Sequence, residues 1–140
     1  MSNDVNQDPI FGPVIYGYSR AQAIDDGVLV EIPESASRAA GFRVPMTMTA
    51  SAWGVTVGFG TDLAELLLKA TAVLAAAMLE YRQSEHRARM GLGEPVGDRL
   101  AFAYDAERED GGFDVVQLVM VIGPGDAGEP VGTVMLPGED

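Results

Sequence analysis

The hydrophobic residues between positions 62 and 89 recur at steps of three and four, which is the spacing of one face of an α-helix. Asp62 and Glu65 stand near the start of this stretch and three arginines near its end, an arrangement that the helix dipole favours. The pattern therefore predicts a long helix from Asp62 to Arg89. The side chains predicted to form its buried stripe are Leu63, Leu66, Leu67, Ala70, Val73, Leu74, Ala77, Met78 and Tyr81.

Three apolar segments after this helix predict β-strands, over residues 100–106, 113–122 and 131–136. The stretches between them are rich in Gly, Asp and Pro, so the three strands are expected to form an antiparallel meander. The middle strand is apolar on both faces from Val115 to Ile122. Such a strand belongs inside a sheet, with each face covered by the chain or by a partner.

Shorter elements are predicted before the long helix. Ser19 and Thr49 are N-cap residues, while Gly27 and Gly41 stand where helices end. Pro45 lacks a backbone donor, which indicates an edge strand. The short helices are expected over 20–26, 35–40 and 50–57, and the strands over 28–32 and 42–48. Together the elements predict an α+β fold in which the long helix covers one face of an antiparallel sheet.

The length of 140 residues and the 47% hydrophobic content fit one domain with its own core. Residues 1–8 are polar and expected to be disordered, which leaves a single domain over 9–140. The chain has no cysteine, no signal-peptide pattern and no apolar stretch long enough to cross a bilayer. We therefore expect a cytoplasmic protein without a membrane partner.

Negative charge is concentrated in the last third of the chain. Eleven Asp or Glu residues follow position 93, against only Arg99 and Arg108, in a chain with a net charge of −12. The negative electrostatic potential of these acids repels nucleic acid and attracts basic surfaces. We therefore expect a basic protein surface as the partner and no direct nucleic-acid binding. The alternative is that the acids only keep the domain soluble. The acids expected to contact a partner are Asp105, Glu107, Glu109, Asp110 and Asp114.

The sequence shows no catalytic or metal-binding signature. The acidic stretch that begins at Asp105 differs from a calcium loop, because Asp110 stands where glycine is required and Val116 where a bidentate acid is required. His86 is the only histidine and lies among charged residues, which is typical of an exposed helix position. We expect no catalytic residue, no metal and no cofactor, and favour a non-enzymatic protein.

Two further interpretations remain open. Tyr16, Tyr18, Arg20 and Trp53 combine aromatic and basic side chains, and around one concave pocket they would form the ligand site of a small nucleotide-binding or enzymatic domain. In the simpler interpretation these aromatic side chains belong to the core and its edge. A structural homodimer is the other hypothesis, since the small residues from Ala70 to Ala77 allow a second copy to approach.

The run from Ile15 to Ile32 resembles the start of an uncharacterised family of small proteins encoded on bacterial plasmids, integrative elements and phages. In that family an IYSYTRAQAIEDGVLVDV-like run is followed by an AGFRFPV-like run, which Ala40–Met46 matches. The GPGD at 123–126 and the MLPGED at 135–140 fit the family's ending. The resemblance implies a mobile-element context and no established chemistry. We therefore expect an anti-defence inhibitor, of the anti-CRISPR or antirestriction type, that occupies a basic nucleic-acid-binding surface of a host defence complex.

Overall fold

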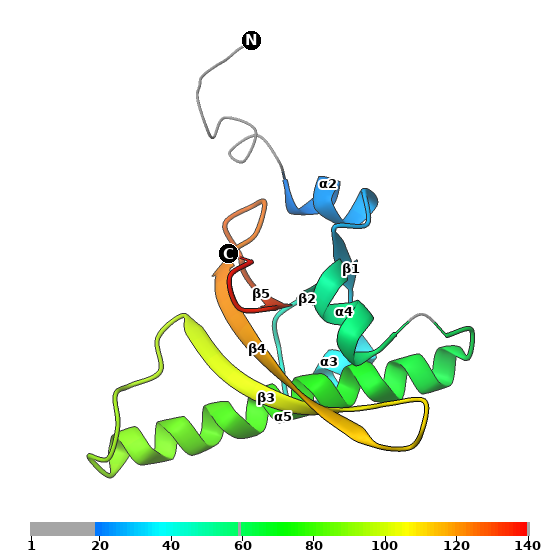
Figure 1. The fold of residues 1–140 in the computed structure, drawn as a ribbon. Helices are drawn as coiled ribbons and strands as arrows, with labels where there is room; N and C mark the ends of the chain where they lie inside the picture. The colour runs from blue at the N-terminus through cyan, green and yellow to red at the C-terminus, as the bar shows by residue number, and fades with distance from the viewer. Residues whose placement is uncertain (1–18, 59, 140) are drawn as a thin grey trace.

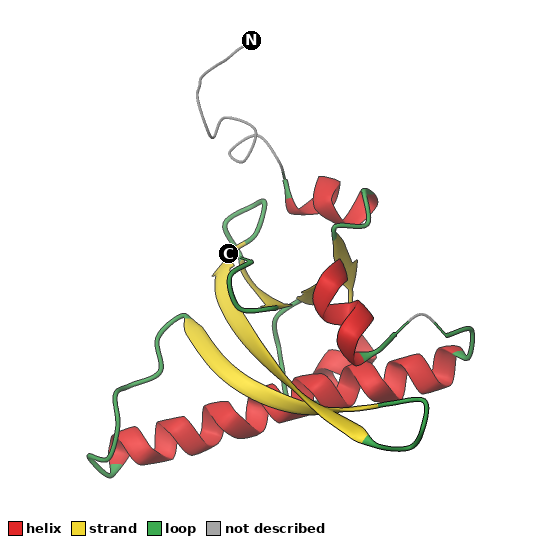
Figure 2. Ribbon diagram, in the orientation of Figure 1, coloured by secondary structure: helices red, strands yellow, loops and turns green. Residues whose placement is uncertain are grey.

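A computed structural model of the chain describes residues 19–58 and 60–139 and has an α+β fold, as predicted. Residues 1–8, which the sequence predicts to be disordered, lie outside these ranges. Figure 1 shows the long helix α5 lying along one side of a twisted sheet, and Figure 2 separates helices from strands. The helices are α2 (Arg20–Asp25), α3 (Glu34–Ala39), α4 (Ala50–Thr56) and α5 (Leu63–Arg89), and the strands are β1 (Leu29–Glu31), β2 (Met46–Thr49), β3 (Arg99–Glu107), β4 (Phe113–Pro124) and β5 (Pro130–Met135).

The five strands form one sheet in the order β1-β2-β5-β4-β3. The last three strands in sequence form the predicted antiparallel meander, and β1 is antiparallel to β2. The sheet is mixed rather than purely antiparallel, because β2 and β5 run parallel with Met46 opposite Gly132. The last strand in sequence thus lies between the N-terminal pair of strands and the C-terminal hairpin.

The expectation that Pro45 marks an edge strand is wrong. Strand β2 pairs with β1 on one side and with β5 on the other. Pro45 lies one residue before β2, where its missing N–H needs no partner, and its carbonyl accepts a hydrogen bond from the Gly132 amide at 2.9 Å. The edges of the described sheet are β1 and β3.

The short helices begin and end at the residues that the sequence indicates. The Ser19 hydroxyl accepts from the Gln22 amide at 3.0 Å, and the Gln22 side chain accepts from the Ser19 amide at 2.9 Å, which completes a capping box. The Thr49 hydroxyl caps α4 by accepting a single hydrogen bond from the Ala52 amide at 3.1 Å. Gly27 and Gly41 follow α2 and α3 with φ angles of +79° and +102°, which favour glycine.

The core lies between the sheet and α5. Ala70, Val73, Leu74 and Ala77 are the buried residues of α5, and they pack into one cluster with sheet residues that include Phe102, Leu118, Met120 and Val134. Leu63 and Tyr81 were predicted in the buried stripe but are exposed. The reason is length: 27 residues make a helix of about 40 Å, and α5 extends past the sheet at its ends (Figure 1). No helix among the described residues is long and apolar enough to cross a membrane.

Candidate functional site

All five acids predicted to contact a partner lie on the β3–β4 hairpin. The strand register places Asp105 opposite Val115 and Glu107 opposite Phe113. These four side chains share one face of the sheet, because residues two apart on a strand point the same way. The alternate positions of the two strands, such as Phe102 of β3, point to the opposite face and into the core against α5. We call Asp105, Glu107, Phe113 and Val115 the hairpin patch.

The hairpin patch exposes large apolar side chains beside its acids. Phe113 is 62% exposed and Val115 is 64% exposed. Within this chain, both faces of β4 are covered only in the half of the strand near β5, where Val119 is buried. Coverage of the other half by a partner stays a prediction. Asp105 and Glu107 are also exposed and make no ion pair with any residue that the structure describes.

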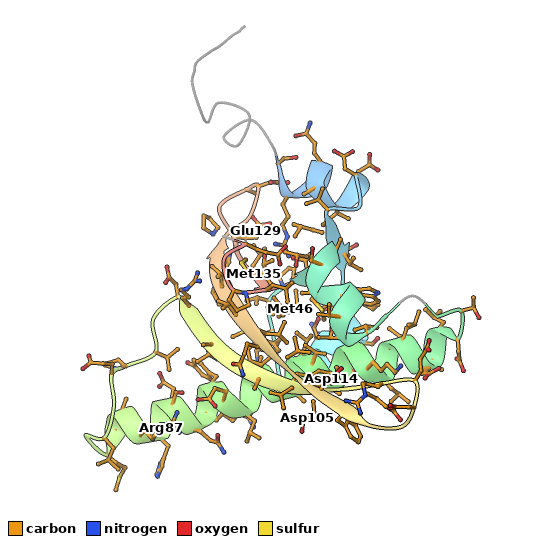
Figure 3. All side chains as sticks on the ribbon, viewed as in Figure 1. Met46, Arg87, Asp105, Asp114, Glu129 and Met135 are labelled. Carbon is orange, nitrogen blue, oxygen red and sulfur yellow. The ribbon has the colours of Figure 1, made fainter. Side chains whose placement is uncertain are left out.

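Arg108 forms ion pairs with two of the three remaining acids of the hairpin, Asp110 and Asp114. Its Nε lies 3.2 Å from Asp110 Oδ1, and one of its terminal nitrogens lies 2.7 Å from Asp114 Oδ1. The same terminal nitrogen donates to the Phe113 carbonyl at 3.2 Å. Figure 3 shows Asp105 and Asp114 on the two neighbouring strands of this hairpin. Asp110 and Asp114 thus help to hold the shape of the turn. The hairpin acids without an ion pair in the described part of the chain are Asp105, Glu107 and Glu109.

Hydrogen bonds in the turn favour the ionised forms of Asp110 and Arg108. The Gly112 amide donates to the Asp110 carboxylate at 2.8 Å, and this bond, followed by the one from Arg108, lowers the pKa of Asp110 below its ordinary value. The hydrogen bonds that Arg108 donates to Asp114 and then to Asp110 raise the pKa of Arg108. Each partner therefore favours the ionised form of the other.

A pocket of about 690 Å³ lies on another part of the molecule, between α3 and the residues around Pro45. Three of the chain's nine Lys and Arg residues line it: Arg20, Arg38 and Arg43. Glu34 also lines the pocket, and one of its oxygens lies 2.8 Å from a terminal nitrogen of Arg38. Arg43 makes no ion pair within the described part of the chain.

Helix α2 brings Arg20 to this pocket. The Asp126 carboxylate in the β4–β5 connection accepts the Arg20 amide at 2.8 Å and the Ala21 amide at 3.1 Å, which holds the start of α2 against that connection. The half-buried Arg20 guanidinium lies 3.4 Å from both Thr133 Oγ1 and the Gly132 carbonyl oxygen. Burial lowers the pKa of Arg20, and nearby acids, Asp126 first among them, oppose that shift.

The predicted ligand site is only partly reproduced by this pocket. Arg20 lines it, whereas Trp53 is not among its lining residues and packs against the hydrophobic core. Tyr16 and Tyr18 lie outside the described residues. Sequence reasoning missed Arg38 and Arg43, although Arg43 stands inside the Gly41–Met46 part of the run that resembles the family.

The remaining candidate residues for catalysis or metal binding are His86 and the acidic side chains. His86 is exposed near the end of α5. Within residues 19–58 and 60–139, no three His, Asp or Glu side chains are grouped so that they could hold a metal ion.

These features define an acidic α+β protein with a charged β3–β4 hairpin and an arginine-lined pocket. The chain belongs to the family DUF6573, a family of unknown function, which matches residues 10–140. This agrees with the resemblance of residues 15–32 to an uncharacterised family. No curated protein matches the chain, and no solved structure does.

Proposed function

We propose that this protein binds a basic protein surface through the hairpin patch. The observation that carries the proposal is the cross-strand pairing of Asp105 with Val115 and of Glu107 with Phe113, all four exposed. Protein interfaces combine an apolar centre with a polar rim, and complementary charge steers and orients the encounter. Solubility alone requires the acids but gives no reason to expose Phe113 and Val115 beside them.

The partner we propose is the nucleic-acid-binding surface of a host defence complex in the cytoplasm. Carboxylates on the rigid β3–β4 hairpin would take the place of nucleic-acid phosphates there, as an anti-CRISPR or antirestriction inhibitor does. The mobile-element context implied by the resemblance of residues 15–32 supports this choice of partner. The net charge of −12 supports binding to a basic protein in preference to nucleic acid itself.

Reversing the three available acids, with Asp105→Lys, Glu107→Lys and Glu109→Lys, is expected to slow association with the partner by about 10- to 1,000-fold. Exposed charges contribute little to stability, so the circular dichroism spectrum should not change. The partner is recovered by pull-down from host cells and identified, and its association rate is measured at low and high salt. Wild-type association should weaken as salt rises, because salt screens surface charge.

The matched control reverses three exposed acids elsewhere in the chain, with Asp25→Lys, Glu94→Lys and Asp98→Lys. The two triple variants have the same net charge, so only the hairpin variant should lose its partner. If both triple variants lost partner binding equally, the loss would be due to overall charge and not to the hairpin patch. Equal, salt-insensitive binding by both would overturn the proposal. A Phe113→Ser variant, with the acids intact, tests the apolar half of the patch through the dissociation rate.

A second candidate function is binding of a small anionic ligand, in line with a nucleotide-binding or enzymatic domain. The pocket of about 690 Å³ lies within the usual size of ligand sites, and arginines bind phosphate and carboxylate groups in bidentate fashion. ADP and inorganic phosphate are expected to raise the thermal midpoint of the wild type and not of Arg43→Gln. Arg89→Gln, on the exposed end of α5, should respond as the wild type does. A midpoint that neither ligand changes contradicts this function.

A further inference from the structure

The exposed side of α5 carries a second hydrophobic row, separate from the one that faces the core. Leu68 is 72% exposed and Leu79 is 59% exposed, and Ala72 and Ala75 between them are exposed as well. Steps of four, three and four residues place all four on one face of the helix. The same alternation continues outward to Glu65 and Arg82, both exposed. We call these six residues the α5 seam.

The α5 seam lies next to an unpaired strand edge. A shallow groove of about 540 Å³ is lined by Ala72, Ala75, Ala76 and Leu79 of α5 together with Ala103, Tyr104 and Asp105 of β3. Strand β3 is nine residues long and pairs only with β4 among the described strands. A long open edge and an exposed apolar row on the same side of a domain mark a contact surface.

We infer that the α5 seam is the contact between two copies of this chain, with the two α5 helices antiparallel. The side chains along the seam are complementary to those of a second seam that runs in the opposite direction. When α5 is aligned antiparallel with a second α5, Leu68 faces Leu79 and Ala72 faces Ala75. The same alignment places Glu65, whose carboxylate lies 3.3 Å from Lys69 Nζ of its own helix, opposite Arg82 of the other copy, so that each end of the seam brings opposite charges together. No other alignment of the seam satisfies all three pairings.

The small residues at the centre of the seam explain the choice of a second copy. Ala72 and Ala75 let two helix backbones approach closely, and the larger Leu68 and Leu79 then pack on either side of this contact. Ala103 of β3 lines the groove beside these two alanines.

Net charge sets the conditions for this dimer. Two chains of net charge −12 repel each other, so self-association should strengthen as salt rises. Binding of a basic partner through the hairpin patch should weaken over the same range. The opposite salt dependences keep the two proposals distinguishable, and neither depends on the other.

Charge substitution in the α5 seam tests the inference. Leu68→Lys alone and Leu79→Glu alone are each expected to shift the wild-type dimer to monomer in sedimentation velocity at high salt. The double variant Leu68→Lys/Leu79→Glu should recover the dimer, because the antiparallel alignment places the opposite charges against each other. The matched control is Leu92→Glu, the same substitution at an exposed leucine outside α5, and it should remain dimeric.

Cysteine pairing gives a second readout that does not depend on the stability of the charge variants. The chain contains no cysteine. A mixture of Ala72→Cys and Ala75→Cys proteins should form the mixed disulfide in preference to either homodimer on mild oxidation. A wild type that stays monomeric at high salt would overturn the inference. So would a double variant that remains monomeric, or disulfides that form without preference for the mixed pair.

Discussion

Replacing Leu74 by alanine is expected to lower the free energy of unfolding by about 2–5 kcal/mol. The Leu74 side chain is among the largest that are fully buried, and it lies in the cluster that joins α5 to Phe102 and Leu118 of the sheet. Removing three carbons there loses the transfer free energy of the side chain and leaves a cavity that rigid neighbours on two layers cannot fill. Urea denaturation monitored by circular dichroism measures the loss.

The control for this prediction is Leu63→Ala, at the exposed first residue of the same helix. It removes the same atoms from a site that water already contacts, so the change in unfolding free energy should stay within about 0.5 kcal/mol. Equal effects at the two positions would show that the burial assigned to the faces of α5 is wrong.

Gly132→Ala is expected to destabilise the protein by about 1–3 kcal/mol, although alanine normally suits a strand better than glycine does. Gly132 lies in β5 opposite Met46 of β2 and Ile122 of β4. A β-carbon at this position would overlap the Met46 sulfur and come within 3.1 Å of Ile122 Cδ1. Met46 is itself fully buried, so its side chain has little room to move aside. Figure 3 shows the position of Met46, at the start of β2.

Gly123→Ala provides the comparison for Gly132→Ala. Gly123 also lies in a strand of the sheet, and a β-carbon there would meet no atom within 4 Å. This variant should be neutral or slightly stabilising in thermal unfolding. Combining Gly132→Ala with Met46→Ala should cost less than the sum of the two single changes, because the second change removes the overlap. Strict additivity would mean that the two residues do not compete for the same space.

Local patterns along the chain predicted most of the helices and strands. The length of α5, the caps at Ser19 and Thr49, and the three-stranded meander all follow from residues close together in sequence. The parallel pairing of β2 with β5 could not be predicted, because no turn joins the two strands and 80 or so residues separate them. For the same reason Pro45 was assigned to an edge.

The candidate surfaces were predictable only in part. The acids of the hairpin patch were found because an excess of charge is visible in composition. Val115 was expected to be covered and is exposed within this chain, since an apolar strand gives no sign of where the sheet ends and solvent begins. The pocket arginines were missed because Arg20, Arg38 and Arg43 come from three separate elements that only the fold brings together.

The position of β5 between β2 and β4 bears on how the chain folds during translation. Strands β1 and β2 leave the ribosome about 80 residues before β5, a delay on the order of ten seconds at typical rates of elongation. Throughout that interval the inner edge of β2 has no partner, and Met46 and Met48 have no Val134 to pack against. Strand β4 ends at Pro124, so the β3–β4 hairpin is complete only shortly before β5 begins at Pro130. Closing the sheet is therefore a single late insertion, and the nascent chain offers chaperones an open strand edge until it occurs.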